Sequence, residues 1–208
     1  MIPLPDKDQI NLLEPFATLS LADVQVVVTL EQAQAAMAEL KAAGVAGFDT
    51  ESKPTFHVGQ QSEGPHVVQL STAHKAWVFQ VHVVESYPVL QAILESEAIA
   101  KVGFGLGSDI ANISRRFGVP ARGIVDLNSR FSAMGYRKTI GARQAIAMLF
   151  GKRFIKSKRI STSNWAARTL TPQQVMYAAN DAYVAIRVYE ALPEVEERLR
   201  SRHDRAAP

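Results

Sequence analysis

Hydrophobic positions change their spacing along the chain, and this spacing separates the expected strands from the expected helices. Short apolar runs bounded by polar or turn residues predict strands that are largely buried. Six such runs are Val24–Val28, Val45–Glu51, His66–Ser71, Ala76–Val81, Ile99–Gly103 and Gly123–Leu127. Apolar residues that recur every three or four positions predict helices between several of these runs.

The expected helices carry recognisable start and stop signals. They cover Leu30–Ala43, Pro88–Glu95, Asp109–Phe117, Gly141–Phe150 and a long segment from Pro172 to about Leu192. Thr29 with Gln32, and Thr171 with Gln174, match the capping box that begins a helix. Pro193 is expected to end the long helix, and a short helix over Glu194–His203 is expected after it.

The order of these elements predicts the fold class. Three successive strands with short connections, beginning at Val45, predict an antiparallel meander. The later strands alternate with helices, which favours parallel neighbours joined by crossovers. We therefore expect an α/β protein with a mixed sheet flanked by helices. The longest irregular stretch is Ser52–Pro65, and no repeat or linker divides the 208 residues, so one domain is the simplest interpretation.

Composition narrows the class of protein further. The chain is 47% hydrophobic and 21% charged, which is typical of a globular domain and not of a disordered or fibrous chain. No apolar run approaches the roughly 20 residues that a membrane helix needs, and the N-terminus shows no secretory signal. We expect a soluble, cytoplasmic protein without membrane contact. Because the chain contains no cysteine, any metal must bind oxygen or imidazole ligands.

Positive charge is concentrated in one part of the chain. Between Ala121 and Leu170 there are eleven Lys and Arg residues against the single acid Asp126. This stretch has a net charge of +10, so the rest of the chain, with an overall charge of +3, carries −7. Like charges repel unless an anionic partner or solvent screens them, so this stretch favours a phosphate-rich partner. A solvated basic face explains the same charges about equally well.

Two carboxylates lie close together on the second expected strand. Asp49 and Glu51 are two residues apart, so they project from the same face of the sheet. A divalent cation such as Mg²⁺ or Mn²⁺ would neutralise such a pair. Taken by themselves, the two acids could also simply mark the end of the strand.

Two further positions supply similar chemistry. Tyr177 and Asp181 lie four residues apart, and thus on one face of the last long helix. Asp109 begins an expected helix, where it would also act as a cap. Four carboxylates and one phenol form the ligand set that a two-metal phosphoryl-transfer centre requires.

These residues, in this order, resemble the three motifs of the DEDD superfamily of 3′-5′ exonucleases, and the tyrosine marks its DEDDy branch. The most specific part is the sequence SNWAARTLT at Ser163–Thr171, followed by YAANDAY at Tyr177–Tyr183. It resembles the subset that contains ribonuclease D and the Werner syndrome exonuclease domain. The resemblance covers about Val24–Leu192 and implies a ribonuclease H-like fold. We accordingly expect residues 1–208 to form a single exonuclease domain with a core over about 22–192.

The resemblance also implies roles for the residues. Asp49 would bridge two divalent cations, Glu51 and Asp181 would complete the tighter site, and Asp109 would hold the second cation through water. Tyr177 would orient the attacking water. The substrate would be DNA or RNA with a single-stranded or recessed 3′ end, and the products would be nucleoside 5′-monophosphates.

Three residues are candidates for contact with nucleic acid. Lys156 and Arg159 precede the Trp165 segment and could hold backbone phosphates. Trp165 could stack on a base, although a packing role beneath the last helix is the stronger expectation.

Two other functions compete with the nuclease. Gly103, Gly105 and Gly107 lie between a strand and a helix, with Asp126 nineteen residues beyond Gly107, as in a dinucleotide-binding oxidoreductase. The spacing is GxGxG, not GxGxxG, and this function leaves the other acids unused. A nuclease-like fold that binds nucleic acid without cleaving it is the other alternative. The sequence does not decide between DNA and RNA, and it leaves the oligomeric state open.

Overall fold

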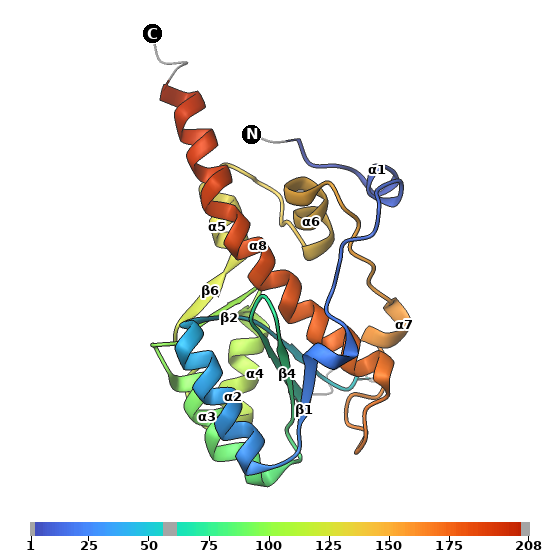
Figure 1. Cartoon of the computed structure of the whole chain (residues 1–208), viewed down its shortest axis with the longest axis vertical. Coiled ribbons are helices and arrows are strands. Elements are labelled where there is room, and N and C mark those ends of the chain that lie inside the picture. Colours follow the sequence, from blue (N-terminus) through green and yellow to red (C-terminus); the bar gives the residue numbers. More distant parts are fainter. Residues whose placement is uncertain (1–2, 56–61, 205–208) are drawn as a thin grey trace.

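A single six-stranded sheet forms the centre of the molecule (Figure 1). The computed structural model describes residues 3–55 and 62–204. The strands are β1 (Val24–Val27), β2 (Val45–Glu51), β3 (Val67–Ser71), β4 (Ala76–Gln80), β5 (Ala100–Gly103) and β6 (Ile124–Asp126). They are arranged in the order β1-β4-β3-β2-β5-β6.

The sheet combines an antiparallel meander with parallel neighbours, as the order of elements predicted. β2, β3 and β4 pair antiparallel in succession. β1 joins β4, β5 joins β2 and β6 joins β5, each in parallel. The expected mixed sheet is therefore confirmed, and β2 lies inside it with a neighbour on each side.

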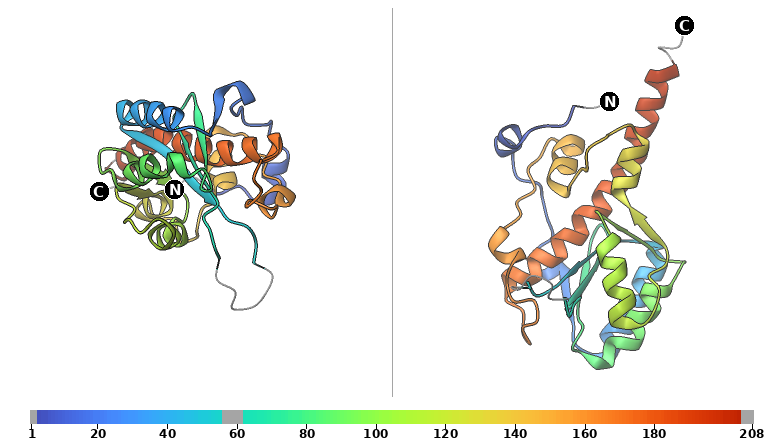
Figure 2. Two further views of the ribbon diagram at one scale, coloured as in Figure 1. Left: turned by 90° about the horizontal axis from the view of Figure 1, so that it is seen from below. Right: turned by 180° about the vertical axis from the view of Figure 1, so that it is seen from behind.

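Helices cover both faces of the sheet. The helices are α1 (Lys7–Asn11), α2 (Leu30–Ala43), α3 (Tyr87–Glu95), α4 (Gly107–Phe117), α5 (Leu127–Ala133), α6 (Ala142–Phe150), α7 (Lys158–Ser161) and α8 (Pro172–Asp204), with short 3-10 turns at Leu21–Asp23 and Val84–Ser86. One core cluster packs α2, α3 and α4 on one face, and a second packs α5, α6 and α8 on the other. α8 crosses the second face as a long diagonal (Figures 1 and 2).

Local signals account for the start and end of the expected helices. Thr29 caps α2 by accepting a hydrogen bond from Gln32 N, and Gly44 ends it at a φ of 69°. The Gln32 side chain, however, accepts from Val28 N and not from Thr29 N, so the second half of that predicted capping box is wrong by one residue. Thr171 and Gln174 do form the reciprocal pair at the start of α8.

The prediction that Pro193 ends the long helix is wrong. α8 continues through Pro193 to Asp204, so the short helix expected over Glu194–His203 is part of it. Tertiary contacts beyond the proline explain this result: Val195 is buried, and Glu196 receives three hydrogen bonds from Arg130 of α5. These contacts offset the hydrogen bond that proline removes from a helix.

Three short helices were not predicted, namely α1, α5 and α7. Each has at most seven residues, too few for a clear apolar period. The stretch expected to be irregular, Ser52–Pro65, has neither helix nor strand at 52–55 and 62–65, and its centre lies outside the described residues. Among the described residues, no helix is both long and apolar enough to cross a membrane.

Candidate active site

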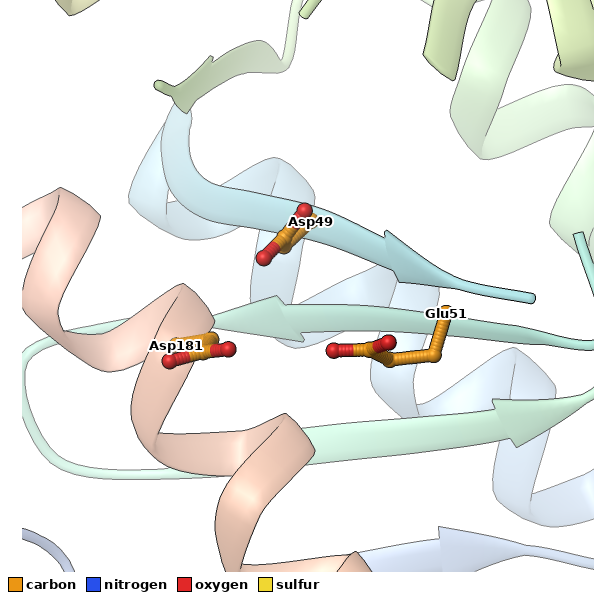
Figure 3. A group of neighbouring side chains, drawn as sticks. All are labelled: Asp49, Glu51 and Asp181. Carbon is orange, nitrogen blue, oxygen red and sulfur yellow. The ribbon is translucent and has the colours of Figure 1, made fainter. Parts of the chain in front are cut away.

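Three carboxylates converge where β2 passes beneath α8 (Figure 3). The alternation of β2 directs Asp49 and Glu51 toward α8, and Asp181 points toward them from that helix. Each of the three offers an oxygen atom, and these atoms all lie within 4.8 Å of one another. Residues 132 positions apart in the sequence thus form one cluster of acids.

A close contact between strand and helix brings the acids together. A Cβ atom at Gly47 would lie 1.8 Å from the carbonyl oxygen of Ala182, so β2 and α8 meet backbone to backbone there. Ala178, Ala182 and Ala185 are fully or almost fully buried along the same helix. Small side chains on both elements let the two backbones come this close. Asp181, which immediately precedes Ala182, is thereby brought close to Asp49.

Burial and mutual repulsion favour the protonated acids. Burial is the largest effect on Asp49, and together with the Asp181 charge it raises the pKa of that carboxyl well above its usual range. For Glu51, burial and then the Asp49 charge raise the pKa to about 9. Burial also raises the pKa of Asp181, against the opposing effect of Lys156. Without a cation, this cluster is costly to ionise.

Lys156 supplies part of that positive charge. Its Nζ lies 2.7 Å from Asp181 Oδ2 and 5.3 Å from the centre of the Tyr177 ring. Burial alone would lower the pKa of Lys156, but Asp181 and Asp49 raise it above its ordinary value. Lys156, predicted to hold a phosphate, therefore lies inside the acidic cluster and makes an ion pair there.

Tyr177 lies beside the same carboxylates. Its hydroxyl lies close enough to Asp181 for the two groups to affect each other's pKa, and its ring packs 5.9 Å from that of Trp165. Burial and the Asp181 charge raise the pKa of Tyr177 to about 12. At neutral pH the phenol is protonated, so it can donate a hydrogen bond but cannot act as a free base.

Asp109 approaches the site from the other face of the sheet. It lies in the first turn of α4 and accepts a hydrogen bond from the hydroxyl of Thr50. Because side chains alternate along β2, the side chain of Thr50 points away from those of Asp49 and Glu51. Asp109 is outside the group of three converging acids, but its charge raises the pKa of both Asp49 and Glu51. The structure thus places it next to the cluster, held through Thr50.

Asp126 has a structural role that weakens the dinucleotide alternative. Its carboxylate accepts hydrogen bonds from the backbone N–H groups of Gly105 and Leu106, at 3.0 Å each, and from Asn128 N. A pyrophosphate would need such N–H groups free. The glycines between β5 and α4 therefore form a turn that Asp126 holds in place.

The other two nucleic-acid candidates have different environments. Arg159 is exposed on α7, outside the residues that line the pocket over the acids. Trp165 is 1% exposed and donates from Nε1 to the carbonyl oxygen of Ser161. The packing role that was the stronger expectation for Trp165 is therefore confirmed, and the buried ring, which packs against Tyr177, is not available to stack on a base.

An open pocket of about 450 Å³ adjoins the carboxylates and is strongly basic on one side. Its lining consists of Glu51, Arg143, Lys156, Ser157, Lys158, Ser161 and Tyr177. Three of these residues are cations from the stretch of net charge +10. The concentration of positive charge predicted from the sequence thus borders the acidic cluster.

Sequence reasoning missed three residues of this region. Thr50 orients Asp109, Arg143 lines the pocket, and Gln69 lies opposite Asp49 in the strand register. Gln69 is fully buried, and neither polar atom of its side chain has a hydrogen-bond partner among the described residues. A signal was present, because Gln69 interrupts the apolar run of β3 as a single polar residue.

The residues present fit divalent cations. Carboxylate oxygens are the ligands that Mg²⁺ and Mn²⁺ prefer, and three of them share one space beside a fourth acid. Burial, followed by mutual repulsion, raises the pKa values of Asp49 and Glu51, and Lys156 contributes a single opposing charge. A bound cation would add further positive charge.

The fold and this site define a class of protein that comparison with known proteins confirms. A family model described as "3'-5' exonuclease" matches residues 24–196, and the chain belongs to that family. It is 31% identical over 151 residues to the mouse bifunctional 3'-5' exonuclease/ATP-dependent helicase WRN, covering 71% of this chain and 11% of that protein. An Arabidopsis thaliana 3'-5' exonuclease is 28% identical over 156 residues, covering 73% of this chain and 53% of the relative. The chain thus spans about a tenth to a half of the length of these relatives.

Solved structures agree on the fold. The Aedes aegypti Nibbler EXO domain superposes with a TM-score of 0.73 at 21% identity, covering 89% of this chain and 99% of that one. Escherichia coli RNase D gives a TM-score of 0.71 at 21% identity, covering 84% and 45%. The expected ribonuclease H-like architecture is therefore confirmed.

Proposed function

We propose that this protein is a metal-dependent 3′-5′ exonuclease that hydrolyses the terminal phosphodiester bond of DNA or RNA and releases nucleoside 5′-monophosphates. The observation that carries the proposal is the convergence of Asp49, Glu51 and Asp181 within 4.8 Å, beside Tyr177 and at the edge of a basic pocket. Membership of the 3′-5′ exonuclease family supports the reaction class.

Two divalent cations, Mg²⁺ or Mn²⁺, are the proposed cofactors. Asp49, Glu51 and Asp181 would hold one, and Asp49 with Asp109 the other. When bound, the pair would supply an activated water and neutralise the charge that develops on the phosphate. Lys156 must then give up its position at Asp181, since a cation and an ammonium group would compete for the same oxygen.

The protein's own residues would position the reactants. The protonated Tyr177 hydroxyl is placed to donate a hydrogen bond and so to orient the attacking water. Arg143, Lys156 and Lys158 line the pocket beside it and are suited to holding backbone phosphates. Such contacts do not depend on base sequence and weaken as salt increases.

The proposed substrate class is a single-stranded or recessed 3′ end. Trypanosoma brucei RNase D, which has the same fold, has been solved as a complex with GMP and as a complex with RNA U12. These complexes support a nucleic-acid partner for the present chain, in which the basic pocket lies next to the carboxylates.

The direct test uses 5′-labelled single-stranded DNA and RNA with Mg²⁺, Mn²⁺ or EDTA. We expect a ladder that shortens from the 3′ end, loss of activity in EDTA, and a decrease of about a thousandfold or more for Asp49→Asn, because several kcal/mol of metal stabilisation are lost. Glu85→Gln, which changes an exposed acid on a different surface, is the matched control. A wild type that binds these strands but leaves them intact with both metals would instead be a non-catalytic binding module.

A further inference from the structure

A second basic pocket adjoins the one over the carboxylates. Its volume is about 480 Å³, within the roughly 300–1,000 Å³ typical of ligand sites. Its lining consists of Lys7, Ile10, Asn11, Arg143, Gln144, Arg153, Phe154 and Ile155. These residues come from α1, α6 and the segment before α7, which lie together on one side of α8 (Figure 1).

The charges in this pocket are uncompensated. Lys7, Arg143 and Arg153 line it, no acid does, and none of the three makes an ion pair within the described part of the chain. Arg153 donates from one guanidinium nitrogen to Asn11 O at 2.8 Å, but its buried Nε has no hydrogen-bond partner there. A buried donor without an acceptor is costly, so the Arg153 guanidinium has hydrogen-bonding capacity that the described residues leave unused.

The pocket also offers an apolar surface. Ile155 is 65% exposed and lines the cavity next to Arg153. Cations beside an exposed apolar side chain complement a nucleotide, which combines a charged phosphate with a base that has an apolar face.

Arg143 connects the two pockets. It lines both, and one of its guanidinium nitrogens donates to the backbone oxygen of Lys156 at 3.0 Å. Lys156 in turn pairs with Asp181 in the carboxylate cluster. The two pockets therefore meet at Arg143, on the same side of the carboxylate cluster as Lys156.

The N-terminal segment that completes this pocket lies outside the region matched by the family model, which begins at residue 24. Backbone hydrogen bonds attach the segment to Arg153: Arg153 N donates to Glu14 O, and Phe16 N donates to Arg153 O. α1 is thereby held opposite α6, and Lys7 faces the cavity. The second pocket is thus built partly by a segment that precedes the region matched by the family model.

We propose that this second basic pocket binds a phosphate and base of the substrate strand on the 5′ side of the nucleotide being removed. The proposal rests on the exonuclease function for its polarity, since the 3′ end occupies the carboxylate cluster and only the 5′-ward strand extends beyond it. Lys7 and Arg153 provide the phosphate contacts, and Ile155 contacts the base.

Binding by strands of different length tests this pocket. The intact protein is titrated in EDTA, which prevents cleavage, with oligothymidylates of three and twelve nucleotides. We expect the longer strand to bind at least tenfold more tightly, because only it reaches both pockets. Lys7→Gln/Arg153→Gln should lose most of that gain and reduce the slope of log Kd against log salt by about 1.4, since each phosphate contact on a single strand contributes about 0.7.

Two further variants keep the test decisive. Lys41→Gln/Arg122→Gln removes the same charge from exposed positions away from both pockets and should bind like the wild type. Because Arg153 also holds Asn11, the exposed Lys7 is changed separately to Glu, and this reversal should weaken binding of the twelve-nucleotide strand only.

Several outcomes would overturn the proposal. One is that the wild type binds the three-nucleotide and the twelve-nucleotide strands with equal affinity. Another is that the double variant and Lys7→Glu both keep the affinity advantage of the longer strand to within about twofold of the wild-type value. A nucleoside 5′-monophosphate that binds the wild type as tightly as the twelve-nucleotide strand, and loses that affinity in Lys7→Glu, would identify the pocket as a site for free nucleotides. If length-dependent binding is lost in the variants while the wild type shows no cleavage with Mg²⁺ or Mn²⁺, the pocket stands and the exonuclease function fails.

Discussion

At the scale of single residues, the position of Lys156 has a direct consequence for metal binding. Its ammonium group lies 2.7 Å from Asp181 in the cluster that the cations would occupy. In the protein without metal it serves as an internal counter-ion. A cation entering the cluster has to displace this group and also experiences its repulsion.

Replacing Lys156 should therefore strengthen metal binding. We expect Lys156→Met to increase Mn²⁺ affinity roughly tenfold, about 1.4 kcal/mol, because one opposing charge is removed from the cluster while the aliphatic stem is kept. Isothermal titration calorimetry measures this directly. Lys158→Met, an exposed neighbour on the same pocket, is the control and should change affinity much less. Unchanged or weaker Mn²⁺ binding by Lys156→Met would contradict the competition.

The hydroxyl of Tyr177 can be tested separately from its ring. Tyr177→Phe retains the packing against Trp165 and removes only the hydroxyl beside Asp181, which is proposed to orient the attacking water. We expect kcat to decrease about a hundredfold or more, while the free energy of unfolding changes by no more than about 1 kcal/mol. Rapid-quench kinetics and urea unfolding give the two values. A variant with wild-type kcat would show that Tyr177 only packs.

At the scale of elements, the site depends on how closely β2 and α8 approach. Gly47 allows their backbones to meet, and the contact lies one residue from Asp181 and two from Asp49. The geometry of the carboxylates is thus coupled to the packing of one strand against one helix.

Gly47→Ala should separate these elements. The added Cβ would lie 1.8 Å from the Ala182 carbonyl oxygen, a backbone atom that can move only with the helix. We expect a loss of about 2–3 kcal/mol in the free energy of unfolding, together with reduced activity as Asp181 shifts. Chemical denaturation and the ladder assay measure both. Gly107→Ala is the control for stability, because its Cβ would meet nothing within 4 Å; equal stability of the two variants would disprove the close contact.

Most elements were predictable because their signals are local. β2 and α2 have the predicted bounds, since an apolar run, an N-cap at Thr29 and a left-handed Gly44 all lie within the segments themselves. The end of α8 was not predictable, because the contacts of Val195 and Glu196 that carry it past Pro193 come from the folded protein. Short helices such as α5 escape prediction for a different reason, because at most seven residues are too few for a clear apolar period.

At the scale of the whole molecule, the acidic cluster links stability to pH and metal. In the folded protein, Glu51 has a pKa of about 9, against 4.5 for the ordinary group. Between these values the folded state binds more protons than the unfolded state. The stabilising contribution of protonated Glu51 is therefore complete below about pH 4.5 and is lost as pH rises through about 9.

Thermal unfolding should reveal this link. In EDTA, we expect Tm to fall by about 3 °C or more between pH 6.5 and 8, given that 1 kcal/mol corresponds to about 2–4 °C for a chain of this size. Mg²⁺ should reduce the fall, because a cation replaces the protons. Glu51→Gln, which cannot ionise, should flatten the EDTA profile. A Tm in EDTA that rises across this range in the wild type but not in Glu51→Gln would contradict the raised pKa of Glu51.

The sequence by itself determined the alternation that directs Asp49 and Glu51 to one face, the helical spacing that aligns Tyr177 with Asp181, and the motifs by which the chain resembles DEDDy exonucleases. These properties depend on neighbours within a few residues. Only the tertiary structure decided that Lys156 pairs with Asp181 and that Asp109 reaches the site through Thr50. It also brought Lys7 and Arg153 into one pocket. Such contacts join residues far apart in the chain, and they form because α8 and the N-terminal segment pack against the rest of the fold, which no local pattern encodes.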